Sequence, residues 1–169
     1  SSLTTARRIL KFLISPMVQP LIEKLQKGDP KQTDELVERL QNAVGDHIPQ
    51  LWRVNLCPQE TTAAAEFLAK QQSLTLGDII RDPHNLSGSI SCVPLIVNRN
   101  EDPSILPRDD ESLRLGDEIL FCGTAQAKRM LSASLNNTYT LDYLMSGTDP
   151  PRGYFFRWLA TRTEPFSTP

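Results

Sequence analysis

The chain has 169 residues, enough for one domain with a substantial core or for a small domain with helical extensions. Its formal net charge of −2 argues against DNA or RNA as a partner, because nucleic-acid-binding domains normally present a basic face. The three cysteines are widely spaced and form no Cys/His cluster, so no metal site is expected, and reduced thiols suit the cytosol.

The sequence contains no evident membrane span. The best candidate, residues 9–21, is interrupted by Lys11, Pro16 and Pro20 and is shorter than the roughly 20 apolar residues that cross a bilayer. A signal peptide is not evident either. We therefore expect this chain to be a soluble piece of its parent protein.

Residues 1–48 are predicted to form a helical hairpin. The first helix is capped by Thr4 or Thr5, is interrupted by prolines, and ends at Lys27 before a Gly-Asp-Pro stop. The second begins at Thr33 and ends at a glycine. Each helix has one apolar side that so small a hairpin cannot bury alone. The hairpin must therefore pack on the following domain, on a missing domain or on another subunit.

Residues 49–135 are predicted to form a small sheet-and-helix lobe, so the chain is expected to be a mixed α/β protein of the α+β class. Strands are expected at Leu51–Leu56, Ile90–Asn98 and Glu118–Cys122, helices from Pro58, Thr75 and Thr124, and a loop over 82–89. In the first strand, alternation places Leu51, Arg53 and Asn55 on one face. Pro94 interrupts the second strand, which indicates an edge position or a bulge.

Residues 136–169 are predicted to form a helical and aromatic tail. A short helix follows Asn137, and a break rich in Gly and Pro comes after it. Phe155, Trp158 and Leu159 then have the i, i+3, i+4 spacing of an amphipathic anchor. These side chains either close the domain's own core or dock on a partner, since aromatic residues dominate interface energetics.

No catalytic constellation is evident. His47 and His84 have no Ser, Cys or carboxylate at a spacing that indicates a triad, and no glycine-rich phosphate-binding motif occurs. The acidic run at 109–111 is expected to be a solvated turn.

Four conspicuous residues are interpreted as parts of the fold. Gly116 and Gly123 are expected to permit left-handed turns, Asp117 to bond local backbone amides, and Thr124 to cap a helix.

Several motifs occur in an order that resembles the RCK C-terminal (TrkA-C) domain, a regulatory domain of potassium channels and transporters. The resemblance covers about Leu51 to Leu131, roughly half of the chain. It rests on a short helix at Thr75–Arg81, a strand ending in arginine at Val93–Arg99, the Ile105–Pro107 segment and the sequence LRLGDEILFCG at Leu113–Gly123.

The resemblance implies a lobe that dimerises, follows a nucleotide-binding Rossmann lobe, and transmits ligand binding to a membrane pore. The chain would then form a homodimer or larger oligomer at the cytoplasmic face of the cell membrane. Some similar lobes bind cyclic di-AMP and others respond to metal ions, so the ligand implied is a nucleotide such as cyclic di-AMP, or none. The resemblance implies Arg81, Cys92 and Val93 as the ligand-binding residues of this chain.

Two other functions remain open from the sequence. One is a small enzyme whose site is assembled from distant cysteine, histidine and carboxylate residues, for example Cys57 or Cys92 with His84. The other is a structural assembly domain that binds no ligand.

Overall fold

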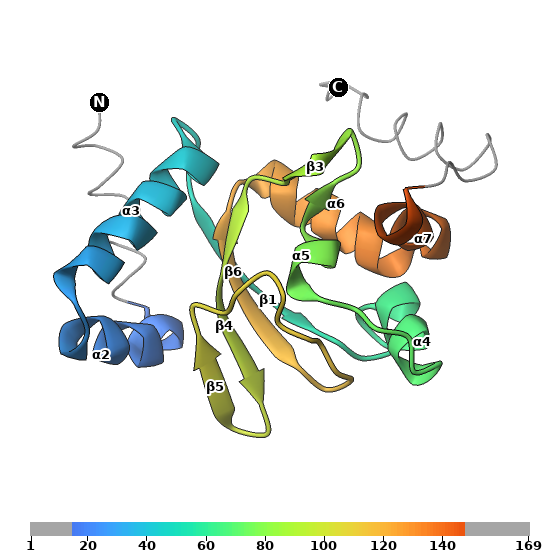
Figure 1. The fold of residues 1–169 in the computed structure, drawn as a ribbon, viewed down its shortest axis with the longest axis horizontal. Helices are drawn as coiled ribbons and strands as arrows, with labels where there is room; N and C mark the ends of the chain where they lie inside the picture. Colours follow the sequence, from blue (N-terminus) through green and yellow to red (C-terminus); the bar gives the residue numbers. More distant parts are fainter. Residues whose placement is uncertain (1–14, 148–169) are drawn as a thin grey trace, which may run out of the picture.

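The computed structural model describes residues 15–147, and these residues form a three-layer α+β fold (Figure 1). A helical hairpin covers one face of a four-stranded sheet, and the remaining helices cover the other face. Two buried apolar clusters separate the layers, one on each face of the sheet. The predicted fold class, a sheet-and-helix lobe preceded by a helical hairpin, is therefore confirmed.

The hairpin layer consists of η1 (Pro16–Val18), α2 (Gln19–Lys27) and α3 (Pro30–Val44). The predicted end of the first helix is confirmed, but α3 begins three residues before the predicted Thr33. Asp29 is its N-cap, and the Asp29 carboxylate accepts a hydrogen bond of 3.0 Å from the Lys31 amide. Pro30 fits the first helical position because its missing amide would have no partner there. The predicted caps Thr4 and Thr5 lie outside the described residues.

The sheet is antiparallel throughout and has the strand order β1-β6-β4-β5. Its strands are β1 (Gln50–Asn55), β4 (Cys92–Arg99), β5 (Asp102–Ile105) and β6 (Glu118–Gly123). Strand β4 is central, and its register shifts between Pro94 and Ile96. The bulge predicted from Pro94 is thus present, whereas the edge position is wrong. The turn between β4 and β5 falls at Asn100 and Glu101, both with positive φ, and β5 begins at Asp102.

The second helical layer contains α4 (Thr62–Ala69), α5 (Leu76–Ile79), α6 (Ala125–Asn136) and α7 (Thr138–Ser146). Helix α4 starts later than the predicted Pro58, because the Thr61 hydroxyl binds the turn formed by residues 55–57. Leu141 of α7 joins the same buried cluster as Trp52 of β1, so α7 packs against the lobe.

The segment predicted as a loop over 82–89 contains a small hairpin. Strands β2 (Arg81–Asp82) and β3 (Asn85–Ser89) pair antiparallel. The hairpin is anchored at its base, where the Ile90 amide donates a hydrogen bond of 2.8 Å to the carbonyl oxygen of Ile80. The loop prediction is therefore wrong, since this segment pairs with itself, and its short polar strands lack the apolar alternation that would reveal them in the sequence.

Candidate functional site

The sheet face beneath the hairpin changes from apolar to polar along its strands. Because the register is known, the side chains on this face fall into cross-strand rows. In the order β1, β6, β4, the rows are Leu51–Cys122–Val93, Arg53–Leu120–Ile96 and Asn55–Glu118–Asn98. The first row lies in the apolar cluster beneath α2 and α3, and the last is entirely polar. The middle row is therefore the boundary between buried and solvated surface.

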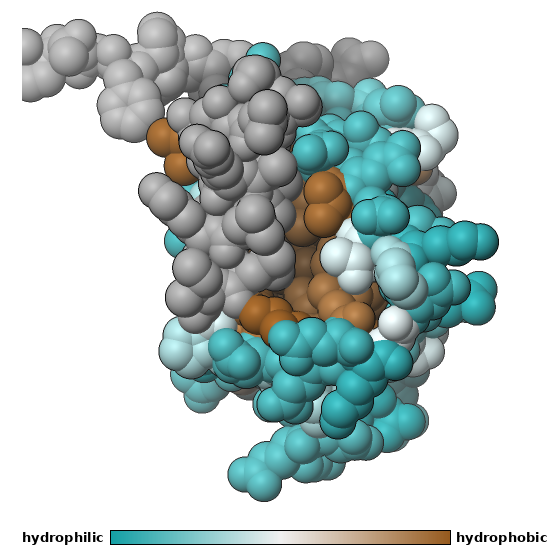
Figure 2. Space-filling model, turned by 90° about the vertical axis from the view of Figure 1, so that its left-hand side faces the viewer, coloured by the Kyte–Doolittle hydropathy of each residue, from teal (hydrophilic) through white to brown (hydrophobic). Residues whose placement is uncertain are grey.

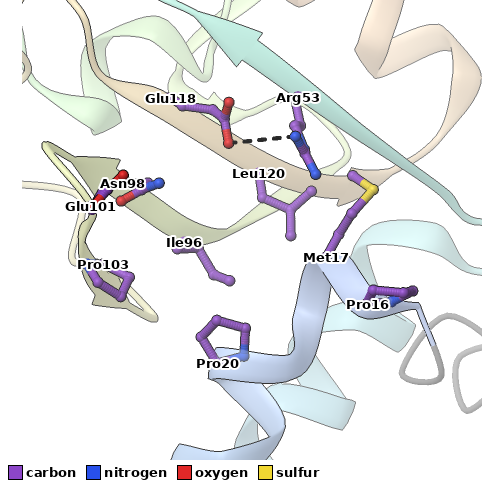
Figure 3. Close-up of a pocket in the computed structure, with 10 residues that line it drawn as sticks. All are labelled: Pro16, Met17, Pro20, Arg53, Ile96, Asn98, Glu101, Pro103, Glu118 and Leu120. Atoms are coloured by element: carbon purple, nitrogen blue, oxygen red, sulfur yellow. Dashed lines mark ion pairs between the residues drawn. The ribbon is translucent and has the colours of Figure 1, made fainter.

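A cavity opens at this boundary, between the sheet and the start of the hairpin (Figure 3). Its volume is about 420 Å³, within the usual range for small-molecule sites. We call it the interlayer cavity. Its lining comes from η1 and α2 above and from all four strands or their turns below. The lining residues are Pro16, Met17, Pro20, Arg53, Ile96, Asn98, Glu101, Pro103, Glu118 and Leu120.

The cavity has an apolar floor. Ile96 and Leu120 are each 6% exposed, and both belong to the buried cluster beneath the hairpin. Met17 and Pro20 approach from the helical side, opposite these two residues (Figure 3). An apolar group of a few carbon atoms entering between them would be removed from water on two sides.

The polar end of the cavity carries charges of both signs. Arg53 Nη1 and Glu118 Oε1 are 3.8 Å apart, too far for a hydrogen bond, and their side chains are 49% and 35% exposed. Glu101 lies at the turn between β4 and β5 and contributes a second carboxylate. Asn98 Oδ1 is buried and has no hydrogen-bond partner among the described residues. These groups retain unused hydrogen-bonding capacity.

The candidate ligand residues taken from the resemblance lie elsewhere. Arg81 donates hydrogen bonds to the carbonyl oxygen of Leu144 and to Asp78 Oδ1, and so joins α5 to the end of α7. Cys92 and Val93 are both buried, in clusters on opposite faces of the sheet. The structure does not bring these three side chains together, and none lines the interlayer cavity. The predicted interface residues Phe155, Trp158 and Leu159 lie outside the described residues.

Of the two cysteines considered for an enzyme, Cys92 is buried and Cys57 is partly exposed. Loss of solvent raises the pKa of Cys92 to about 12, with a smaller contribution from Cys122, and burial raises the pKa of Cys122 to about 12 as well. Both thiols are therefore protonated at neutral pH and poor nucleophiles. His84 lies in the turn between β2 and β3, where its amide bonds Asp82 Oδ1 at 2.8 Å. The interlayer cavity is lined by neither His84 nor any cysteine.

The best-satisfied ion pair supports the fold. Asp117 is fully buried and accepts hydrogen bonds from Arg99 Nε at 2.8 Å and Nη2 at 2.6 Å. It also accepts one from the Arg114 amide at 2.8 Å, which confirms its predicted bond to local backbone. The hydrogen bonds that Arg99 donates to the Asp117 carboxylate raise the pKa of Arg99. This pair fixes the end of β4 to the turn that precedes β6.

Sequence reasoning missed the cavity itself. The alternation in β1 correctly placed Arg53 on the face of Leu51, and that was the available signal. The partners of Arg53 come from β6 and from the start of α2, more than 30 positions away in either direction, and only the sheet register and the packing of the hairpin reveal them.

Residues 15–147 contain neither a candidate membrane span nor a metal-binding cluster. No helix there is both long enough and apolar enough to serve as a membrane span. No group of three or more His, Cys, Asp or Glu side chains in the same residues is arranged to hold a metal ion.

Comparison with known proteins identifies no relative. No protein-family model matches this sequence, and no curated protein matches it.

Proposed function

We propose that this chain is a non-catalytic regulatory domain of a potassium channel or transporter, acting at the cytoplasmic face of the cell membrane. In this role it senses a ligand and works as a homodimer or larger oligomer, together with the membrane part and a Rossmann RCK lobe. The main support is the way in which the motifs resembling TrkA-C fold together. These motifs are separate in sequence but form one hydrogen-bonded unit.

The contact between α5 and the segment before β6 carries this argument. The Leu76 amide bonds the carbonyl oxygen of Glu111 at 2.9 Å, and the Gly77 amide bonds that of Asp109 at 2.8 Å. Thr75 and Ser112 form an antiparallel bridge at the same place. Helix α5 thus docks its N-terminus on residues 109–112, which lead directly into the LRLGD turn, and the Leu113 amide at the start of that turn bonds the carbonyl oxygen of Leu74 at 2.8 Å. These contacts connect two pieces of the resemblance through the residues next to them.

The helix in this unit also has the predicted local structure. Thr75 and Asp78 form a capping box: the Asp78 amide bonds the Thr75 hydroxyl at 3.3 Å, and the Thr75 amide bonds Asp78 Oδ2 at 2.9 Å. A capping box fixes both the start and the direction of a one-turn helix. The position of Arg81 after this helix is therefore well defined, as a regulatory element requires.

Surface features support an oligomeric partner. Strand β1 lies at the edge of the sheet, so one side of its backbone pairs with no other strand among residues 15–147, and such an edge can pair with a strand of a partner. Ile48, just before β1, is 70% exposed. Figure 2 shows hydrophobic side chains on the hairpin side of the molecule, with hydrophilic residues to their right and below.

The proposal is tested by measuring mass and ligand response on the 169-residue chain. Size-exclusion chromatography with light scattering is expected to give the mass of a dimer or larger oligomer. A thermal-shift screen with cyclic di-AMP, ATP and divalent cations is expected to find at least one stabilising ligand, since a ligand that binds only the folded state raises Tm. A clean monomer at high concentration would contradict the proposal. An oligomer that no ligand stabilises would favour the structural assembly domain instead.

A further inference from the structure

We propose that the interlayer cavity is a binding site for a small apolar α-amino acid in its zwitterionic form. The side chain would lie on the apolar floor, the carboxylate on Arg53, and the ammonium group between Glu118 and Glu101. This site is separate from Arg81, and the proposal stands whether or not the domain regulates a channel.

Size and polarity first restrict the ligand to a small molecule with one apolar end. The cavity of about 420 Å³ has Ile96 and Leu120 as its floor and Met17 and Pro20 on the opposite side. The carboxylate of Glu118 and the amide of Asn98 follow one row further along the same strands. A ligand lying parallel to the strands therefore meets apolar side chains at one end and polar groups at the other.

The charges of the lining then favour a zwitterion. Arg53 contributes one positive charge, and Glu101 and Glu118 contribute two negative charges, so the net formal charge of the ten lining residues is −1. A nucleotide phosphate would meet a net repulsive site with a single cation. A simple alkylamine would leave Arg53 unused, and a fatty acid would leave both carboxylates unused. An α-amino acid uses both kinds of side chain: its carboxylate accepts hydrogen bonds from Arg53, and its ammonium group donates hydrogen bonds to the two glutamates.

The existing ion pair in the cavity is weak enough for a ligand to replace. At 3.8 Å, Arg53 and Glu118 attract each other without a hydrogen bond, and both are partly exposed. Such exposed pairs contribute little, because solvent and salt screen both charges. A carboxylate on Arg53 can form two parallel hydrogen bonds, which the present geometry does not give that guanidinium. The exchange therefore gains hydrogen bonds at little cost.

Asn98 adds a further polar group that lacks a partner. Its Oδ1 is buried without a hydrogen bond among the described residues, although the residue lines the cavity. Rotation of the terminal amide by half a turn exchanges oxygen and nitrogen, so Asn98 can present either an acceptor or a donor. With the oxygen turned toward the cavity, Asn98 can accept a hydrogen bond from a ligand ammonium, and with the NH₂ group there it can donate one to a ligand carboxylate.

The experiment compares three probes of similar shape by NMR titration and calorimetry on the 169-residue chain: L-leucine, 3-methylbutylamine and 4-methylpentanoate. L-leucine is expected to bind at millimolar concentration or below and to shift the amide signals of Ile96, Asn98 and Leu120. Each analogue lacks one charged group and is expected to bind about tenfold more weakly, because a charged hydrogen-bond partner is lost. No shift with L-leucine, or equal binding of the amine, would overturn the proposal.

Matched variants test the residues. Arg53→Gln and Glu118→Gln are each expected to weaken L-leucine binding about tenfold. Glu66→Gln, in the exposed Glu66–Lys70 pair on α4, removes a charge away from the cavity and is expected to leave binding unchanged. Because Arg53 and Glu118 are partly exposed, these variants are expected to fold, and circular dichroism checks this. L-leucine binding that survives Arg53→Gln would also overturn the assignment.

Discussion

At the scale of single residues, two ion pairs near the same strands differ in what they do. Asp117 is fully buried and receives three hydrogen bonds, two of them from Arg99. Arg53 and Glu118 are partly exposed and form none with each other. Removing one partner of a buried pair leaves an uncompensated charge, whereas an exposed pair loses little. The first pair therefore serves stability, and the second is free to serve binding.

Replacing Asp117 by Asn is expected to lower the free energy of unfolding by about 3 kcal/mol, because Arg99 and the Arg114 amide lose a charged acceptor. Urea denaturation monitored by circular dichroism measures the change. The matched control is Asp110→Asn, which breaks an exposed ion pair with Arg108 and is expected to cost less than about 0.5 kcal/mol. Equal losses of unfolding free energy in the two variants would show that the buried pair contributes no more to stability than the exposed one.

The buried cysteines make stability depend on alkaline pH. Their folded-state pKa is raised from 9.0 to about 12, so folding favours the protonated thiol. This contribution is fully present below pH 9 and is lost as pH rises towards 12. We expect the free energy of unfolding to fall across that interval, and to fall less steeply in the double variant Cys92→Ala, Cys122→Ala. Identical slopes in both proteins would contradict this explanation.

Alkylation provides a second measurement on the same thiols. With iodoacetamide at pH 8, we expect Cys57 to react in the folded chain, because it is partly exposed. Cys92 and Cys122 should react only after unfolding, and mass spectrometry of the digested protein locates the label.

At the scale of elements, the helix ends that depend on neighbouring residues could be predicted from the sequence, and contacts between distant segments could not. The capping box at Thr75, the cap at Thr124 and the end of α3 at Gly45 each depend on residues within one turn of helix. The interlayer cavity depends on partners distant in sequence. The β2–β3 hairpin is local, but its strands are short and mostly polar, so no apolar alternation marks them. For α3, two capping residues competed, and Asp29 prevailed because Pro30 follows it.

Gly123 illustrates the same distinction. It was expected to adopt a left-handed turn, but positive φ is found at Gly116 and not at Gly123. A Cβ at Gly123 would lie 2.6 Å from Cys92 Cβ and closer still to the carbonyl oxygen of Ser91. The prediction was therefore right for Gly116 and wrong for Gly123, where close packing against the start of β4 requires glycine.

Gly123→Ala is thus expected to lower the free energy of unfolding by about 3 kcal/mol, since backbone atoms must move to relieve the overlap. Gly116→Ala is the control: its Cβ would meet nothing within 4 Å, and the positive φ costs about 1 kcal/mol. Urea denaturation of both variants measures the difference. A Gly116 variant as unstable as the Gly123 variant would contradict the packing argument.

At the scale of the whole molecule, the two faces of the sheet have separate apolar clusters, and the hairpin contributes to the cluster on one face alone. Leu40 of α3 belongs to the cluster beneath the hairpin, and Leu131 of α6 belongs to the cluster on the opposite face. The hairpin is joined to the sheet by the short connection at 45–49. We therefore expect the hairpin to open as a unit while the sheet and the second helical layer remain folded.

Native-state hydrogen exchange on two variants tests this separation. Leu40→Ala and Leu131→Ala each remove a buried leucine and should cost about 3 kcal/mol. Leu40→Ala destabilises the native state relative to both the opened and the unfolded state, so exchange should accelerate in α3 and in β4 and β6. Leu131→Ala destabilises the native and the hairpin-opened states equally relative to the unfolded state. Exchange should therefore accelerate in β4 and β6, while the exchange rate in α3 stays the same. If hydrogen exchange were accelerated equally everywhere in both variants, residues 15–147 would unfold as one cooperative unit. A ligand in the interlayer cavity would then stabilise the whole fold and not the attachment of the hairpin in particular.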